Sequence, residues 1–296
     1  MVSGLQRYPV VAFCVLAYAW TWACFGGAHQ ALTLMAQDRA GEAGLSVVIV
    51  LLAPFGPTFS ALLMTGLLEG RAGLRDLWRR LRLWRVSVGY YAFVLCWLAL
   101  AKLAGAAIVA LAGSGIYEMP NLAHWTALPL RFLMILFLGG PLGEEIGWRG
   151  FALPRLVARH GPGPASLRLG LVWALWHLPV FLIAGTDQYG QPILWYTVMV
   201  TAYTFLFTWV HEKTGGSLLL ALLHHTAINV GLWLTSMPAL RSTEWRLFGL
   251  TMPGPWLFAC AFAWLLVAVV WHWPGLRLAA PYRMATVRER TSTVSS

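Results

Sequence analysis

Two adjacent glutamates and an arginine are the first residues of this sequence that could do chemistry. Glu144, Glu145 and Arg149 stand at the end of an apolar run, residues 128–142, that otherwise has the character of a membrane helix. A charged side chain at that depth costs about 2.5–3.5 kcal/mol to insert. The whole chain has only 11 Asp and Glu residues, so two of them side by side in an apolar region indicate a function.

Two histidines and an asparagine form the second group of candidates. His177 lies about nine residues into the predicted span 168–185, and His225 lies about ten residues into the predicted span 215–235. At about 1.5 Å per residue, both reach roughly the middle of the bilayer. Asn229 follows His225 by four residues, so the two side chains share one face of a helix.

These residue types allow a small number of chemical roles. A glutamate and a histidine can activate water, and two histidines with a carboxylate can hold Zn²⁺. An asparagine and a second histidine can stabilise an oxyanion. Glu145 and Arg149 have the i, i+4 spacing of an ion pair along a helix, whereas Glu144 is rotated by about 100° and faces another neighbour.

Each candidate also has a structural interpretation when it is taken alone. A buried histidine is often an ordinary core residue, an asparagine in a span often joins helices, and a Glu–Arg pair can be a clamp. The combination weakens these interpretations, because the residues come from three different spans at compatible depth. We therefore interpret them as one site.

The elements that must position these residues are membrane helices. Hydrophobic residues make up 59% of the chain and charged residues 11%, whereas soluble domains have about 25% charged residues. Eight apolar segments are long enough to cross a bilayer, which takes about 20 residues. They are residues 8–27, 45–67, 88–112, 126–143, 168–185, 192–210, 215–235 and 254–273. The predicted fold is an all-α polytopic bundle in one domain, residues 1–279, with its motif-bearing core at about 126–235 and a disordered cytoplasmic tail at 280–296.

Arginines predict how the bundle is oriented. They cluster between spans two and three, between spans four and five and after the last span, so both termini are predicted to be cytoplasmic. Leucines and tryptophans at helical spacing in residues 74–84 predict a basic amphipathic helix on the cytoplasmic leaflet, either as a topology anchor or as a docking surface. The net charge of +10 does not indicate nucleic-acid binding, because the arginines form no single basic domain.

The motifs resemble those of the CPBP family of intramembrane proteases, which contains CAAX prenyl endopeptidases and bacteriocin-processing or immunity proteins. That family is marked by EExxxR, FxxxH and HxxxN on successive spans. In this chain they stand as Glu144-Glu145-x-x-x-Arg149, Trp173-x-x-x-His177 and His225-x-x-x-Asn229. The tryptophan in place of phenylalanine falls on an aromatic packing position, so we expect it to change the shape of the pocket more than its chemistry.

The resemblance implies a role for each residue. Glu144 is the general base with His177 as its partner on the water, and His225 and Asn229 orient that water or bind the oxyanion. Glu145 is a supporting carboxylate held by the arginine of its own motif, Arg149. The family is classed as metalloproteases, in which case Glu144, His177 and His225 are the zinc ligands. A metal-free Glu–His pair is the alternative that the sequence leaves open.

The sequence thus predicts an integral protein of a bacterial cell membrane that acts as an endopeptidase. Its substrate is a membrane-embedded or lipidated peptide, and a CAAX substrate would be cut just after its prenylated cysteine. One alternative is a non-catalytic, immunity-like binding protein with the same fold. The other is an ion- or proton-coupled transporter that uses the charged residues as a relay, although the sequence shows no inverted repeat.

Overall fold

Helices make up almost all of the structure, a computed structural model that describes residues 6–36, 48, 51–111, 120–183, 186, 188–234, 244–247 and 250–272. The longer helices are α2 (Pro9–Ala36), α4 (Gly56–Leu81), α5 (Val88–Leu111), α6 (Leu128–Leu138), α9 (Pro162–Trp176), α10 (Ile193–Lys213), α11 (Leu218–Leu234) and α13 (Gly254–His272). The shorter segments are η2 (Ala53–Phe55), η3 (Pro120–Ala127), α7 (Pro141–Glu145), η4 (Ile146–Ala152), α8 (Leu153–His160) and η5 (Leu178–Phe181). Strands β1 (Glu244–Leu247) and β2 (Leu250–Pro253) form a small antiparallel hairpin before α13.

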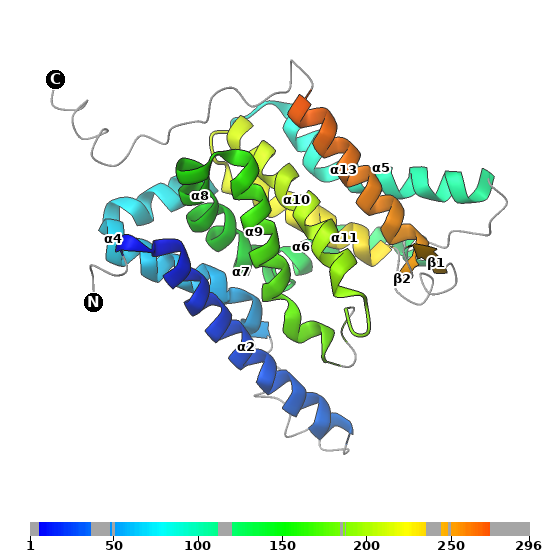
Figure 1. Cartoon of the computed structure of the whole chain (residues 1–296), viewed down its shortest axis with the longest axis horizontal. Helices are drawn as coiled ribbons and strands as arrows, with labels where there is room; N and C mark the ends of the chain where they lie inside the picture. The colour runs from blue at the N-terminus through cyan, green and yellow to red at the C-terminus, as the bar shows by residue number, and fades with distance from the viewer. Residues whose placement is uncertain are drawn as a thin grey trace.

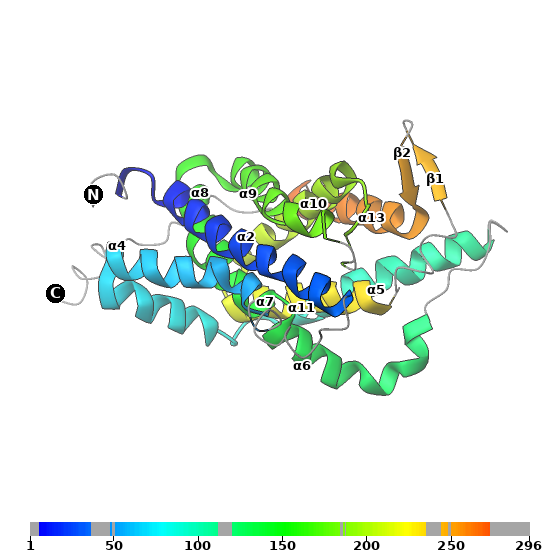
Figure 2. The ribbon, with the colours of Figure 1, turned by 90° about the horizontal axis from the view of Figure 1, so that it is seen from below.

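The bundle is arranged around α9 and α10, which pack against each other near its middle (Figures 1 and 2). Helix α2 packs on α4 toward one side, and α5 and α13 pack together toward the other. Helix α11 contacts α5, α6 and α7, so it connects the two sides. This arrangement brings α7, α9 and α11, which carry the three motifs, into one region.

Membrane-spanning character is present in several helices. By length and composition, three stretches within the described residues can cross a bilayer: Pro9–Gly27, Ala123–His160 and Ile193–Lys213. Shorter apolar helices cover Val88–Ala104, Leu218–Leu232 and Cys260–His272. The protein is therefore an integral membrane protein, while the count of eight spans and the orientation of the termini stay predictions. The predicted tail 280–296 lies outside the described residues.

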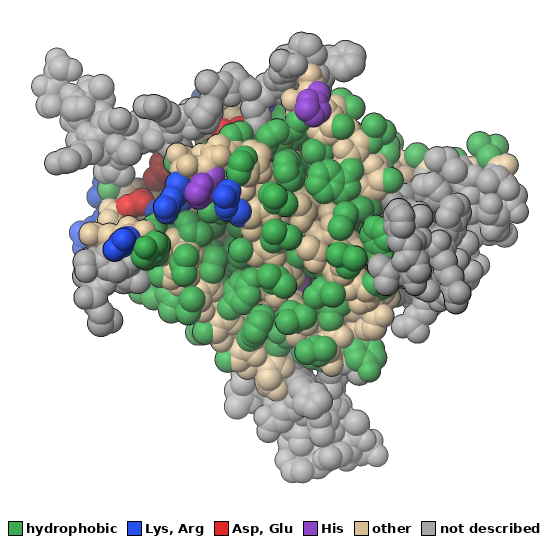
Figure 3. Space-filling view, viewed as in Figure 1, with side chains coloured by type: hydrophobic (Ala, Val, Ile, Leu, Met, Phe, Trp, Pro, Cys, Tyr) green, Lys and Arg blue, Asp and Glu red, His purple; other side chains and the backbone are tan. Residues whose placement is uncertain are grey.

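The surface agrees with that placement. The face shown in Figure 3 is largely hydrophobic, and its lysine and arginine side chains gather at the end where α4 and α8 lie. Apolar side chains on such a face are solvated by lipid tails, and a basic end belongs at the lipid head groups.

The predicted span 126–143 is interrupted just before the glutamates. Helix α6 ends at Leu138, and Gly140 has a φ of 110°, which only glycine adopts without strain. Pro141 then starts α7, where its fixed φ and missing N–H are tolerated. The chain continues through the π-helical turn η4, a type of turn that is frequent at functional sites, into α8. This break determines the direction in which Glu144 points.

The predicted span 168–185 is also corrected by the structure. Helix α9 starts earlier, at Pro162, and ends at Trp176, so His177 caps the helix instead of lying in its middle. Pro179 explains the early end, because proline lacks an N–H and its ring clashes with the carbonyl group four residues before it. The short turn η5 follows.

Glycines in α7 and η4 let these two segments pack closely against η2 and the start of α4. A Cβ atom on Gly143 would lie 2.5 Å from the carbonyl oxygen of Pro54, and one on Gly147 would lie 2.5 Å from the Cβ of Pro57. This four-residue spacing is the small-x-x-x-small pattern by which membrane helices come into close contact. Pro54 and Pro57 accompany a short 3₁₀ turn, η2, which leads directly into α4.

The predicted amphipathic helix at 74–84 forms the end of α4, which has a kink at Gly70 and ends at Leu81. Trp78 is exposed, but Arg80 is buried. The Arg80 guanidinium donates hydrogen bonds of 2.9–3.0 Å to the carbonyl oxygens of Arg149, Gly150 and Gly216. One arginine of the basic helix thus joins α4 to η4 and to the turn before α11.

Candidate active site

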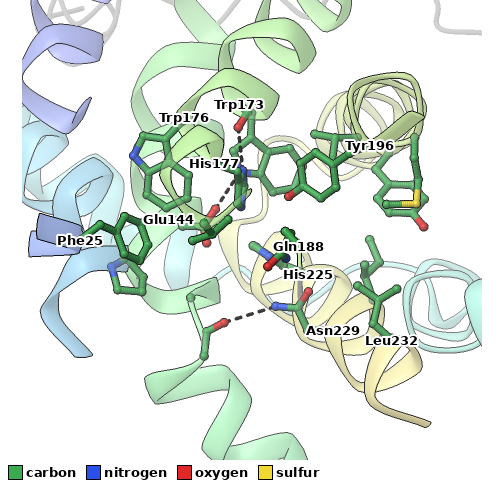
Figure 4. A pocket seen from close by; sticks show the side chains of 18 residues that line it. Phe25, Glu144, Trp173, Trp176, His177, Gln188, Tyr196, His225, Asn229 and Leu232 are labelled. Carbon is green, nitrogen blue, oxygen red and sulfur yellow. Dashed lines mark hydrogen bonds between the residues drawn. The ribbon is translucent and has the colours of Figure 1, made fainter. Parts of the chain in front are cut away.

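A cavity of about 230 Å³ lies between α7, α9, α10 and α11. Glu144, His177, His225 and Asn229 all line it, and Figure 4 shows their side chains around a common space. The remaining wall is mostly apolar or aromatic. The structure therefore brings together the four residues that the sequence proposes as catalytic.

Glu144 is placed by the break between α6 and α7. Its side chain is buried, and its Oε2 accepts a 2.7 Å hydrogen bond from the indole Nε1 of Trp173. A Cβ atom on Gly140 would lie 2.6 Å from Glu144 Oε1, so Gly140 supplies space as well as the unusual backbone angle. The carboxylate is held between the loop and α9 and faces the cavity.

His177 is oriented by its own helix. Its Nδ1 lies 2.8 Å from the carbonyl oxygen of Trp173, which can only accept a hydrogen bond. Nδ1 therefore carries the proton, and Nε2 of the neutral ring is an acceptor. The ring packs edge-to-face on Trp176 and Tyr196, with centroid distances of 4.7 and 5.4 Å. These contacts fix the imidazole, so Nε2 is the atom available to a water.

Glu145 lies behind the cavity wall, where it joins two motifs. Its Oε1 accepts a hydrogen bond of 2.8 Å from Arg149 NH1 and another of 2.7 Å from His225 Nδ1. The Arg149 side chain is fully buried, with its guanidinium 4.1 Å from the ring centroid of Trp173 and 3.8 Å from that of Phe207. The ion pair agrees with the i, i+4 spacing, but the contact with His225 was not predicted.

His225 and Asn229 occupy successive turns of α11. Because Glu145 holds Nδ1 of His225, Nε2 is the ring nitrogen left for the cavity. Asn229 Nδ2 donates a 3.3 Å hydrogen bond to the carbonyl oxygen of Gly139, which ties α11 to the break before α7. Both residues thus present polar atoms to the region that Glu144 and His177 face.

The predicted zinc ligands fit a metal by type but not by arrangement. Glu144, His177 and His225 are suitable donors, and both histidines have an anchored Nδ1 as metal-binding histidines do. Among the described residues, however, no three His, Cys, Asp or Glu side chains are placed to share one ion. Whether zinc takes part therefore stays a prediction.

Sequence reasoning missed three residues of the site. Trp173 was interpreted as packing alone, although a buried indole N–H needs an acceptor and could have been foreseen to find one. Tyr196 and Tyr203 line the cavity from α10. Their i, i+7 spacing, which puts both on one helix face, was an available signal.

The fold and the cavity define a helical membrane protein with a buried site of carboxylates and histidines. Residues 125–231 match the family described as Type II CAAX prenyl endopeptidase Rce1-like. The chain is also 31% identical over 109 residues to the CAAX prenyl protease 2 of Methanococcus maripaludis. That match covers 35% of this chain and 39% of the relative, so the chain spans well under half of the relative's length. Over residues 125–231, which hold the three motifs, this chain is therefore similar to CAAX prenyl endopeptidases.

Proposed function

We propose that the protein is an intramembrane endopeptidase that hydrolyses a peptide bond in a membrane-associated, lipid-modified substrate. One observation carries this proposal: Glu144, His177, His225 and Asn229, from three different elements, line one largely apolar cavity. A hydrolase needs a base, an oriented water and an oxyanion site, and these residue types supply all three. The similarity to CAAX prenyl proteases favours a prenylated CAAX-type peptide as the substrate.

In the proposed reaction, Glu144 and His177 activate a water molecule. The Glu144 carboxylate takes one proton from the water while the free Nε2 of His177 accepts a hydrogen bond from it. The oxygen then bonds to the carbonyl carbon of the scissile peptide, and the carbonyl electrons move to oxygen. When this intermediate collapses, the C–N bond breaks and Glu144 gives the proton to the leaving amine, so the enzyme returns to its starting state.

His225 and Asn229 stabilise the negative charge on the intermediate's oxygen. The Asn229 amide donates through Nδ2. His225 Nε2 donates when the ring carries both protons, because Nδ1 is already directed at Glu145. Donors that are placed before the reaction are worth about 10²–10³ in rate each. Glu145 and Arg149 keep His225 in this orientation without facing the substrate.

Purified protein in nanodiscs tests the proposal with a farnesylated CAAX reporter peptide and the same peptide without the lipid. We expect cleavage of the farnesylated peptide, and its loss in each of Glu144→Ala, His177→Ala and His225→Ala with the fold retained. Leu130→Ala on the exposed face of α6 serves as the matched control. Full activity in any of the three site variants would overturn the assignment.

Two further measurements separate the alternatives on the same sample. Elemental analysis and a chelator arm decide the metal: loss of cleavage on chelation with stoichiometric zinc assigns a metal, and cleavage without metal leaves the Glu144–His177 pair as the activator. Peptide that binds without being cut supports the non-catalytic binding protein. Charge-dependent flux in proteoliposomes supports the transporter.

A further inference from the structure

Trp173 contacts four charged or titratable residues of the site: Glu144, Arg149, His177 and His225. Its indole N–H lies 2.7 Å from Glu144 Oε2, and its ring face lies 4.1 Å from the Arg149 guanidinium. Its backbone carbonyl oxygen lies 2.8 Å from Nδ1 of His177 and accepts a hydrogen bond from it. Its ring also packs edge-to-face on His225, with centroids 5.4 Å apart. The residue is 3% exposed, so these contacts are made away from solvent.

The indole contacts both Glu144 and Arg149, and Arg149 interacts electrostatically with both neighbouring carboxylates. Arg149 pairs with Glu145, and Glu144 is the adjacent residue in the chain. The face of the indole covers the guanidinium, while its edge offers Glu144 a donor that carries no charge. A buried carboxylate without a donor is costly. Trp173 therefore gives the Glu144 carboxylate a hydrogen-bond donor without placing a positive charge beside it.

A phenylalanine at this position would retain only part of this arrangement. Its ring face could still cover Arg149 by a cation–π contact. It has no N–H, so Glu144 would lose its 2.7 Å hydrogen bond and would be free to turn. The expectation that the tryptophan affects mainly the shape of the pocket is therefore incomplete.

We propose that Trp173 is a positioning residue for the reaction: its indole N–H holds the Glu144 carboxylate toward the cavity and away from Arg149. Glu144 thereby stays available to a water while Glu145 takes the arginine. This inference rests on the proposed function, because it assigns the residue that directs the proposed base.

The kinetic test separates the N–H group from the shape of the ring. Trp173→Phe removes the N–H and one ring, and 3-benzothienylalanine at position 173 keeps the bicyclic shape but replaces the N–H by sulfur. We expect both to lower kcat by about 10- to 100-fold, as loss of a hydrogen bond to a charged group does. KM should change little, because the bond positions the base and does not bind the peptide.

Trp195 provides the matched control. It is a partly buried tryptophan on α10 that does not line the cavity, and its Nε1 has no hydrogen-bond partner among the described residues. The same two replacements there should leave kcat and KM unchanged. A benzothienylalanine variant at position 173 with the kcat of the unmodified protein would overturn the inference, because shape alone would then suffice.

A second readout does not depend on catalysis. In ¹⁵N-labelled protein, the indole N–H resonance of Trp173 is identified by its absence from Trp173→Phe. We expect this resonance to move upfield in Glu144→Ala, because the hydrogen bond is lost, and to stay in place in Leu130→Ala. No movement in Glu144→Ala would overturn the inference whatever the protein cleaves. Movement without cleavage of any peptide by the unmodified protein would overturn the proposed function and the positioning role of Trp173 in the reaction, but not the hydrogen bond between Trp173 and Glu144.

Discussion

Helix α6 and the segment that follows it, residues 141–152, lie in opposite surroundings. None of the eleven residues of α6, all of which the structure describes, is buried, although its sequence is almost entirely apolar. Residues 141–152 carry Glu144, Glu145 and Arg149, and every one of them except Leu142 is buried. The more hydrophobic of the two consecutive segments is therefore the one outside the core.

The difference in burial between α6 and residues 141–152 follows from the lipid that surrounds the protein. Lipid tails are as apolar as leucine, so α6 has little to gain by packing against protein. A charged group has no partner in lipid and must be enclosed by protein that supplies one. In this membrane protein, polar residues within an apolar region are the better indicators of the core.

The largest effect expected from this comparison is on the buried charges. Glu145→Ala should lower the free energy of unfolding by about 3–5 kcal/mol, because it leaves Arg149 buried without its carboxylate. The same change also removes the acceptor of His225. Denaturant titration in detergent micelles measures the loss in free energy of unfolding.

Glu144→Ala is the matched control for that prediction. Its carboxylate faces the cavity and has a neutral donor, so we expect a smaller loss of stability together with complete loss of cleavage. Equal losses of stability in the two variants would contradict the division of the carboxylates into a working group and a supporting group.

An intermediate effect is expected where the buried segment touches α4. In Gly147→Ala the added Cβ would lie 2.5 Å from the Cβ of Pro57, so α4 has to shift, at a cost of about 1–3 kcal/mol. Gly26→Ala in α2 is the control, because nothing lies within 4 Å of a Cβ there. Equal unfolding midpoints in the two variants would show that the close approach does not matter.

The smallest effect is expected on α6. Leu133 is 51% exposed, and Leu133→Ala should change the free energy of unfolding by less than about 0.5 kcal/mol and leave cleavage intact. Leu153 is fully buried next to the site segment, and Leu153→Ala should cost about 2–5 kcal/mol. A comparable loss in both would mean that α6 packs against protein in the membrane.

Much of the fold could be predicted from local patterns. Helices occur at each predicted span within the described residues. The predictions failed where a local break depends on one or two residues. A run of apolar residues in the sequence does not indicate that Gly140 adopts a φ of 110° or that α9 ends before Pro179.

The sequence by itself determined which residues form the candidate site and which pair of them lies along one helix. Motif composition and i, i+4 spacing are local properties, and helix geometry converts them directly into shared faces. Those inferences needed no knowledge of neighbouring helices.

Only the tertiary structure decided what each polar group faces. The break at Gly139–Gly140 aims Glu144 at the cavity, and the packing of α11 brings His225 onto Glu145. The packing of α9 places the Trp173 N–H on Glu144. These contacts join residues 29 and 80 positions apart, and no spacing within a single helix can specify them.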